Sequence, residues 1–218
     1  QHFIDETLAE HRPNDALLSE EAADDSDRLT ADRVWIIDPL DGTQEYSEFD
    51  RADWAVHIAL WERKDADGKP SDEGSITQAA VALPAYNMTL STHQLPKTPD
   101  RHEGKPRLVV SRNRATREAV IVAEALDCDV ARLGSAGAKT MAVVLGEVDI
   151  YVHAGGMYQW DSAAPIAVAA AAGLFTSRID GTPLVYNRRD AWLPDLVVCQ
   201  QHLAQQVIDA LRAGRLGA

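Results

Sequence analysis

Residues 38–43 have the sequence Asp-Pro-Leu-Asp-Gly-Thr and directly follow the apolar run 34–37. The proline fixes its own φ and cannot donate a backbone hydrogen bond, so we expect the strand to end at Asp38 and the chain to turn. The turn aims the carboxylates of Asp38 and Asp41 at one point. The glycine that follows can adopt a positive φ, and successive backbone N–H groups can then form a nest for an anion. Two carboxylates beside a phosphate site are an arrangement that suits Mg²⁺.

Other acidic side chains also follow short apolar runs. Glu20 and Glu21 come after the run 16–18. Asp161 leads into the alanine-rich segment 162–172, where we expect it to be the N-cap of a helix. An isolated Asp-x-x-Asp-Gly-Thr segment is equally consistent with a turn closed by aspartate side chains. Carboxylates at the ends of several elements favour a metal site instead, because such ends can converge.

A glycine-rich segment and two histidines are weaker signals. Residues 134–137 have the sequence Gly-Ser-Ala-Gly at the start of a predicted helix, whose N-terminus can receive an anion, and Lys139 adds positive charge. Such glycines more often serve close packing of a helix on a strand. His57 and His153 lie on strand-like runs, where a single histidine is usually structural.

Composition restricts the class of protein. The 218 residues carry a net charge of −13, which argues against nucleic-acid binding because that function needs a basic surface. The longest small-apolar stretch, 163–175, is shorter than the roughly 20 residues that span a bilayer, so no membrane segment is expected. Cys128 and Cys199 lack metal or redox spacing and are expected to be reduced core residues. No signal peptide is visible, which predicts a cytoplasmic protein. The chain starts at Gln1 inside a predicted helix, so an N-terminal helix is expected to be missing.

The elements that must position these residues follow from hydrophobic periodicity and from the turn residues. The first half is strand-rich and the second half alternates strands with helices, which predicts a mixed α/β (α+β) fold. The irregular segment 93–106 suggests a boundary between an α+β subdomain, 1–103, and an α/β subdomain, 104–218. The predicted helices are 1–11, 115–126, 138–145 and 162–172. The predicted strands are 16–18, 34–37, 54–61, 77–83, 107–111, 130–133 and 148–152.

Three motifs, in this order, resemble those of the inositol monophosphatase superfamily. They are Ser-Glu-Glu at 19–21, Trp-Ile-Ile-Asp-Pro-Leu-Asp-Gly-Thr at 35–43 and Trp-Asp-Ser-Ala-Ala-Pro at 160–165. The resemblance implies a layered α-β-α-β-α sandwich and a magnesium-dependent phosphomonoesterase with two or three ions. The Gln-Glu-Tyr continuation at 44–46 is more similar to bisphosphate nucleotidases, which remove the 3′-phosphate of 3′-phosphoadenosine 5′-phosphate.

Departures from the motifs leave alternatives open. Ser19 stands where the superfamily usually has Gly, Gln44 where it has Lys or Arg, and Tyr46 where it has Phe. The alternative functions are an inositol monophosphatase, a fructose-1,6-bisphosphatase and a non-catalytic regulatory protein of the same fold. The partner is expected to be a small phosphate ester. The resemblance also implies a homodimer, since dimers are frequent in the superfamily.

The resemblance also implies roles for individual residues. Glu20, Asp38 and the Leu40 carbonyl would hold one ion, and a third, weaker ion could share Glu20. Asp38, Asp41 and Asp161 would hold the second ion. The attacking water would be activated by metal, with Glu20 and Thr43 as catalytic residues.

The remaining implied residues would contact the substrate. Backbone N–H groups of Gly42 and Thr43 would hold the phosphate near Asp41 and Asp161. In the superfamily that threonine is supported by an aspartate on a helix that would precede Gln1. The rest of the substrate is expected to meet three further side chains, those of Ser135, Lys139 and His153.

Overall fold

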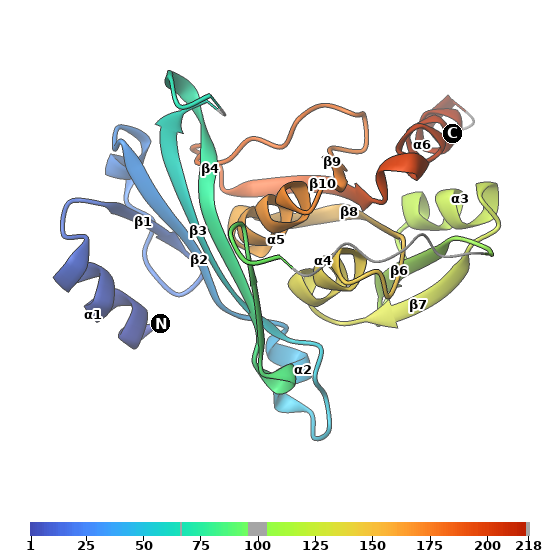
Figure 1. The fold of residues 1–218 in the computed structure, drawn as a ribbon, viewed down its shortest axis with the longest axis horizontal. Coiled ribbons are helices and arrows are strands. Elements are labelled where there is room, and N and C mark those ends of the chain that lie inside the picture. Colours follow the sequence, from blue (N-terminus) through green and yellow to red (C-terminus); the bar gives the residue numbers. More distant parts are fainter. Residues whose placement is uncertain (66, 96–103, 217–218) are drawn as a thin grey trace.

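The computed structural model describes residues 1–65, 67–95 and 104–216. Within them the chain forms two five-stranded sheets with helices between and outside them (Figure 1). The first sheet lies in the first half of the chain and the second sheet in the second half. The predicted boundary at 103/104 adjoins residues outside the described ranges and stays a prediction.

The first sheet is antiparallel except at one edge. Its strand order is β1-β2-β3-β4-β5, and β1 is parallel to β2. The inward face is marked by alternation along β3, where every second residue is buried. The strands are β1 (Ala16–Ser19), β2 (Arg33–Asp41), β3 (Ala55–Lys64), β4 (Pro70–Leu83) and β5 (Met88–Ser91).

The second sheet is mixed, with the strand order β7-β6-β8-β10-β9. Strand β6 is parallel to β7 and β8, whereas β10 is antiparallel to both β8 and β9. Its centre is apolar on both faces, as expected for strands covered by helices on each side. The strands are β6 (Arg107–Ser111), β7 (Asp129–Leu133), β8 (Ile150–Tyr158), β9 (Phe175–Ser177) and β10 (Trp192–Cys199).

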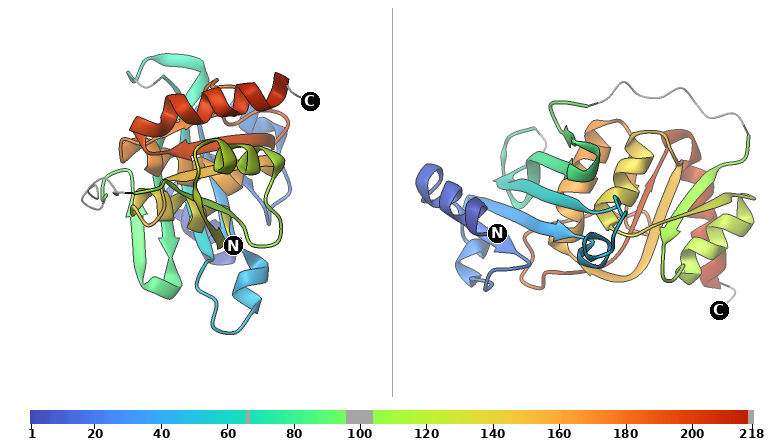
Figure 2. Two further views of the ribbon diagram at one scale, coloured as in Figure 1. Left: turned by 90° about the vertical axis from the view of Figure 1, so that its right-hand side faces the viewer. Right: turned by 90° about the horizontal axis from the view of Figure 1, so that it is seen from below.

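Helices complete an α-β-α-β-α arrangement (Figures 1 and 2). α4 and α5 fill the space between the two sheets, while α3 and α6 cover the outer face of the second. The α-helices are α1 (His2–His11), α2 (Thr43–Ser47), α3 (Arg117–Ala125), α4 (Ala136–Val144), α5 (Gln159–Ala171) and α6 (Ala204–Leu216). Short 3₁₀ turns are η1 (Ser26–Leu29), η2 (Pro84–Tyr86) and η3 (Gln201–Leu203).

The small residues of α4 and α5 explain why two helices fit between two sheets. Ala163, Ala164 and Ala169 have no exposed surface, and Ala142 is 2% exposed. Alanine allows close backbone approach on every side of a helix and favours helix formation at little entropic cost. The mixed fold and layered architecture predicted from the sequence are confirmed.

The expectation that the strand ends at Asp38 is wrong. Strand β2 continues through Pro39 to Asp41, and its pairing with β3 shifts between these two aspartates. Asp38 pairs with His57 and Asp41 with Ala55, so three steps on β2 match two on β3. This bulge accommodates a proline that cannot donate a ladder hydrogen bond.

The expectation that Asp161 is an N-cap is also wrong. Helix α5 begins two residues earlier, at Gln159, and Tyr158 precedes it. Asp161 lies in the first turn, where its Oδ2 accepts the Tyr158 N–H at 2.6 Å and so satisfies a donor at the helix start. The sequence analysis did not predict β5, β9, β10, α2 or α6.

Two minor expectations can be checked in the same structure. Cys128 and Cys199 are both free thiols, half-buried and buried respectively. Among the described residues, no helix has the length and apolar character required to cross a bilayer.

Candidate active site

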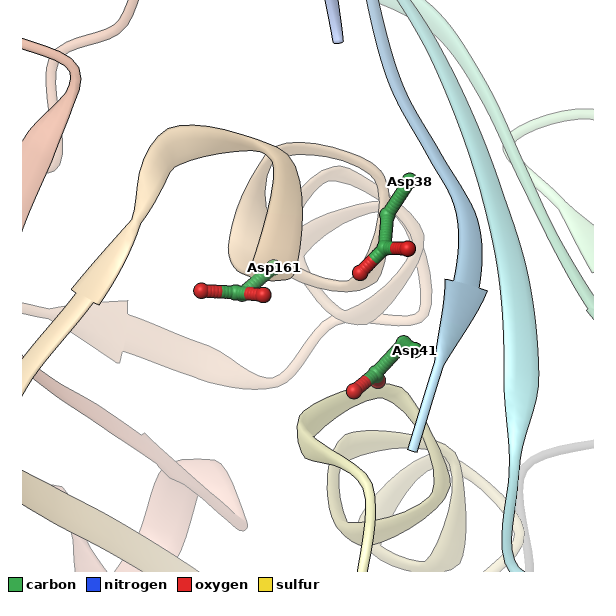
Figure 3. A group of neighbouring side chains, drawn as sticks. All are labelled: Asp38, Asp41 and Asp161. Carbon is green, nitrogen blue, oxygen red and sulfur yellow. The ribbon is translucent and has the colours of Figure 1, made fainter. Parts of the chain in front are cut away.

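Three aspartates converge where the first sheet meets α5. One carboxylate oxygen from each of Asp38, Asp41 and Asp161 lies within 4.8 Å of the other two. Figure 3 shows Asp38 and Asp41 leaving β2 towards the end of α5 that carries Asp161. Asp38 is 1% exposed and Asp41 is 8% exposed, so two ionisable groups are almost removed from water. We name these three residues the acidic cluster.

The bulge in β2 is what brings two of these side chains together. Residues three apart on a regular strand point to opposite faces of the sheet. The shifted pairing between Asp38 and Asp41 reverses that alternation, and both side chains become buried. Asp38 Oδ1 also accepts the N–H of Leu40 at 2.9 Å, which fixes the carboxylate within the bulge.

Asp41 is held by the N-terminus of α4. Its Oδ2 accepts hydrogen bonds from Ser135 Oγ at 2.7 Å and from the Gly137 N–H at 2.6 Å. Its Oδ1 accepts the Ala136 N–H at 3.3 Å. The same Ser135 hydroxyl caps α4 by accepting the Ala138 N–H at 2.8 Å. Free N–H groups and the helix dipole therefore stabilise the charged form of Asp41.

His57 joins β3 to the same carboxylate. Its Nδ1 lies 3.1 Å from the Trp160 carbonyl, so Nδ1 carries the proton. Its Nε2 lies 3.2 Å from Asp41 Oδ2, an ion-pair distance without the geometry of a hydrogen bond. Burial would lower the pKa of His57, but the Asp41 carboxylate outweighs it and raises that pKa above its ordinary value.

The pKa values of the aspartates differ because their partners differ. Burial, then the charge of Asp41, raises the pKa of Asp38 to about 8. The same two causes raise the pKa of Asp161 to about 6. Burial acts on Asp41 as well, but contacts with His57 and the α4 N-terminus leave its pKa below the ordinary value.

The acidic cluster fits a hard divalent cation. Its donors are carboxylate oxygens, which Mg²⁺ prefers, and they lie close enough to share an ion. Buried carboxylates with raised pKa values lack compensating positive charge, which a bound cation supplies.

Glu20 lies beside the acidic cluster rather than within it. It follows β1, and its N–H donates to the Ile37 carbonyl at 3.4 Å. Its side chain is exposed, yet burial and the charges of Glu21 and Asp41 raise its pKa, partly offset by a hydrogen bond with Asp38. Its role as a metal ligand stays a prediction.

Gly42 and Thr43 lie at the start of α2. Gly42 has a φ of +89°, the left-handed conformation expected from the sequence, and an added Cβ would come within 2.9 Å of Ser135 Cβ. The Thr43 hydroxyl is exposed and donates to the Leu40 carbonyl at 3.2 Å. The structure thus brings the predicted phosphate donors and the predicted carbonyl ligand next to one another.

The three predicted substrate contacts have protein partners. Ser135 binds Asp41, as described above. Lys139 is 3% exposed, and its Nζ donates to the carbonyls of Gly134 and, at 2.9 Å, Ser135. Burial lowers the pKa of Lys139 to about 8. His153 Nε2 lies 3.0 Å from the Gly156 carbonyl. Contact of these side chains with a substrate stays a prediction.

Sequence reasoning gave His57 too little weight. The signal was present, because His57 stands between Ala55 and Ala59 in the inward register of an alternating strand. The expectation that Gly137 serves close packing of a helix on a strand is confirmed, because an added Cβ would lie 2.0 Å from Nε2 of His57 on β3. The absence of a side chain at Gly137 is what allows α4 to reach Asp41.

Comparison with known proteins agrees with this site. The inositol monophosphatase family matches residues 1–214. The chain belongs to this family. Its members are metal-dependent phosphatases, which agrees with the chemistry of the acidic cluster.

Individual relatives in the inositol monophosphatase family differ in similarity. The 3′-phosphoadenosine 5′-phosphate phosphatase of Mycobacterium bovis is 49% identical over 94% of this chain and 76% of its own length. The 3′(2′),5′-bisphosphate nucleotidase CysQ of Escherichia coli is 31% identical over 74% of this chain and 65% of its own length. An inositol monophosphatase II of Staphylococcus aureus, solved with inositol monophosphate, superposes with a TM-score of 0.77 at 20% identity, covering 98% of this chain and 83% of the other.

Proposed function

We propose that this chain hydrolyses the 3′-phosphate of 3′-phosphoadenosine 5′-phosphate and releases adenosine 5′-monophosphate and inorganic phosphate. The observation that carries the proposal is the 49% identity, over 94% of the chain, to a phosphatase named for that substrate. The acidic cluster supplies the chemical reason, since an acidic protein needs a cation to bind an anionic ester.

Two or three Mg²⁺ ions are proposed to bind at and beside the acidic cluster. Asp38, Asp41 and Asp161 are the ligands best supported by geometry. Glu20 and the Leu40 carbonyl are proposed as further ligands, because each is adjacent to Asp38. When bound, such ions neutralise phosphate charge and lower the pKa of water at the site.

The chain's own residues orient the reacting groups. Asp41 is kept charged and fixed by the α4 N-terminus, so it can serve as a ligand without rearrangement. The backbone N–H groups of Gly42 and Thr43 donate to the phosphate oxygens. Thr43 Oγ1 accepts a hydrogen bond from the attacking water and so orients it, and its present bond to the Leu40 carbonyl keeps the oxygen close to the proposed ligands.

Ser135, Lys139 and His153 are proposed to shape the substrate side of the site. Ser135 and Lys139 act through the loop that begins α4, since both are bonded to it. His153 supports the glycine-containing bulge of β8 before Tyr158 through its bond to the Gly156 carbonyl. A cytoplasmic location and a homodimer are further proposals.

A substrate panel tests the proposal. Phosphate release should be measured with 3′-phosphoadenosine 5′-phosphate, inositol 1-phosphate and fructose 1,6-bisphosphate under the same Mg²⁺ concentration. We expect the highest kcat/KM with the nucleotide. A higher kcat/KM with either of the other esters contradicts the substrate assignment but not the phosphatase chemistry. Absence of release from all of them would favour a non-catalytic regulatory protein.

A further inference from the structure

Three aromatic side chains gather at one end of the second sheet. Tyr158 ends β8 and pairs in register with Trp192 at the start of β10. The Tyr158 ring is stacked on Trp160, with centroids 4.7 Å apart and planes 12° from parallel. Trp192 meets Tyr158 edge to face, with centroids 5.5 Å apart. We name Tyr158, Trp160 and Trp192 the aromatic platform.

The aromatic platform is anchored on one side and open on the other. Trp160 packs against the main hydrophobic core. Tyr158 is 45% exposed and Trp192 is 46% exposed, although their neighbours on β8 and β10 are largely buried. Large aromatic surface left in water at a fixed place marks a binding site more often than a requirement of folding.

A glycine-containing bulge in β8 fixes the position of the platform. Gly156 has a φ of +88°, and an added Cβ would lie 1.5 Å from the Trp192 ring. The indole therefore rests directly on backbone. The Gly156 carbonyl lies 3.0 Å from His153 Nε2, so that histidine holds the bulge on which Trp192 rests.

The aromatic platform is directly connected to the acidic cluster. The Tyr158 N–H donates to Asp161 Oδ2 at 2.6 Å, and Trp160 is the residue before Asp161. The Trp160 carbonyl also lies 3.1 Å from His57, which faces Asp41. A phosphate ester held at these aspartates would thus carry its organic group next to exposed aromatic rings.

The segment that leads into Trp192 carries charges of both signs. Arg188 and Arg189 are both exposed, and Asp190 Oδ1 accepts the Trp192 N–H at 3.0 Å. Their backbone is fixed on α5, because Gln159 Nε2 donates to the carbonyls of Arg188 at 3.4 Å and Asp190 at 2.9 Å. Exposed aromatic rings connected to a phosphate-binding cluster suit a phosphate ester with a flat ring, and this combination favours a nucleotide over an apolar peptide.

We propose that Tyr158 and Trp192 bind the purine base of the substrate by stacking and so select nucleotides over base-free phosphate esters. This inference rests on the proposed function, because it assumes a nucleoside phosphate at the acidic cluster. Stacking of a base on an aromatic side chain corresponds to about a 5- to 150-fold change in affinity. The platform contributes specificity rather than chemistry.

Calorimetric titration with two probes tests the platform. Adenosine 5′-monophosphate and ribose 5-phosphate differ by the base alone, and both are titrated with Mg²⁺ present. Trp192→Leu and Tyr158→Leu remove an aromatic face, whereas Trp192→Phe and Tyr158→Phe retain one. We expect each leucine variant to lower the ratio of the two affinities about tenfold or more, and each phenylalanine variant to retain most of it. Tyr86→Leu is the matched control, since Tyr86 is a 59% exposed tyrosine in η2, outside the platform.

The outcomes separate the platform from the proposed function. Equal weakening of both probes, or an unchanged ratio in both leucine variants, would overturn the platform. The leucine variants are also compared with the wild type by sedimentation velocity. A changed sedimentation coefficient with an unchanged ratio of the two affinities would overturn the platform and assign this face to contact between copies of the chain. A base preference that depends on Trp192, in a protein that does not hydrolyse 3′-phosphoadenosine 5′-phosphate, would support the platform and contradict the proposed function.

Discussion

Nε2 of His57 lies 3.2 Å from Oδ2 of Asp41, and the two groups come from neighbouring strands whose pairing is shifted by a bulge. The same oxygen accepts the Gly137 N–H at 2.6 Å. One carboxylate thus joins β2, β3 and the start of α4. The position of Asp41 in the acidic cluster depends on all three elements, and substitutions in any of them should change metal binding.

Gly137→Ala should weaken metal binding without altering a ligand. The added Cβ would lie 2.0 Å from His57 Nε2, so the histidine and α4 must separate. Overpacking of this kind costs about 1–3 kcal/mol of stability. We expect a loss of about 10- to 100-fold in Mg²⁺ affinity, measured by calorimetry.

A double variant provides the control for Gly137→Ala. In a His57→Ala background the added methyl group has room, so the second substitution should cost little beyond the first. If Gly137→Ala lowers Mg²⁺ affinity by the same factor in the wild type and in the His57→Ala background, contact with His57 is not the reason for glycine at this position.

Ser135→Ala should damage both the site and the helix. Its hydroxyl donates to Asp41 at 2.7 Å and accepts the Ala138 N–H at 2.8 Å. Loss of the cap should lower the free energy of unfolding by about 1 kcal/mol, measured by urea denaturation. Mg²⁺ affinity should fall about 10-fold or more. Ser135→Thr retains both bonds and should restore both quantities; failure of the threonine variant to do so would contradict the dual role.

The metal-free protein should become less stable as pH rises through the titration of Asp38. Burial and the charge of Asp41 raise the pKa of Asp38 to about 8, against 3.8 for an ordinary aspartate. Between these values the folded state retains a proton that the unfolded chain has released. The free energy of unfolding therefore falls as pH rises across this interval.

Chelator-treated protein should accordingly be compared by urea denaturation at about pH 5.5 and about pH 8. Asp38→Asn cannot titrate at this position and should lose less stability between the two values than the wild type. Saturating Mg²⁺ should abolish the difference, because it binds the charged form. The same pH dependence in the wild type and in Asp38→Asn would refute the assignment.

Lys139→Ala should affect all substrates alike. The ammonium is buried and bonded to the carbonyls of Gly134 and Ser135, so its removal should loosen the loop that holds Asp41. We expect the free energy of unfolding to fall by about 1–3 kcal/mol and kcat/KM to fall by similar factors with nucleotide and inositol phosphate. Lys64→Ala is the control, since that lysine is half-exposed and pairs with Glu62 at the surface. A rise in KM confined to the nucleotide would instead make Lys139 a direct substrate contact.

The sequence predicted the mixed fold and the Asp38–Asp41 pair because their signals are local: Asp38 directly follows an apolar run, and strands and helices alternate in the second half. The layered architecture and the place of Asp161 in the site were implied by the resemblance to the superfamily. The bulge was not predictable in this way. Proline alone indicates a break, and only pairing with β3 shows that the strand continues to Asp41.

Residues that act through long-range contacts were the least predictable. His57 gains its role from Asp41 and from the Trp160 carbonyl, which lies 103 positions away in the chain. Trp192 reaches Tyr158 only because β10 pairs with β8 after the long connection that follows α5. Local periodicity and composition carry no information about such contacts between residues that are distant in the sequence.

Phosphate release from 3′-phosphoadenosine 5′-phosphate during a Mg²⁺ titration, in wild type and in Asp38→Asn, tests the acidic cluster most directly. Glu21→Gln is the matched control, because Glu21 is also acidic but lies outside the acidic cluster. We expect saturable activation by Mg²⁺ in the wild type and in Glu21→Gln. In Asp38→Asn we expect an intact fold and a rate of phosphate release lower by more than about 100-fold, because loss of a metal ligand should cost more than loss of a residue that only supports a ligand. Undiminished turnover in excess chelator, or wild-type activation of Asp38→Asn by Mg²⁺, would contradict the account.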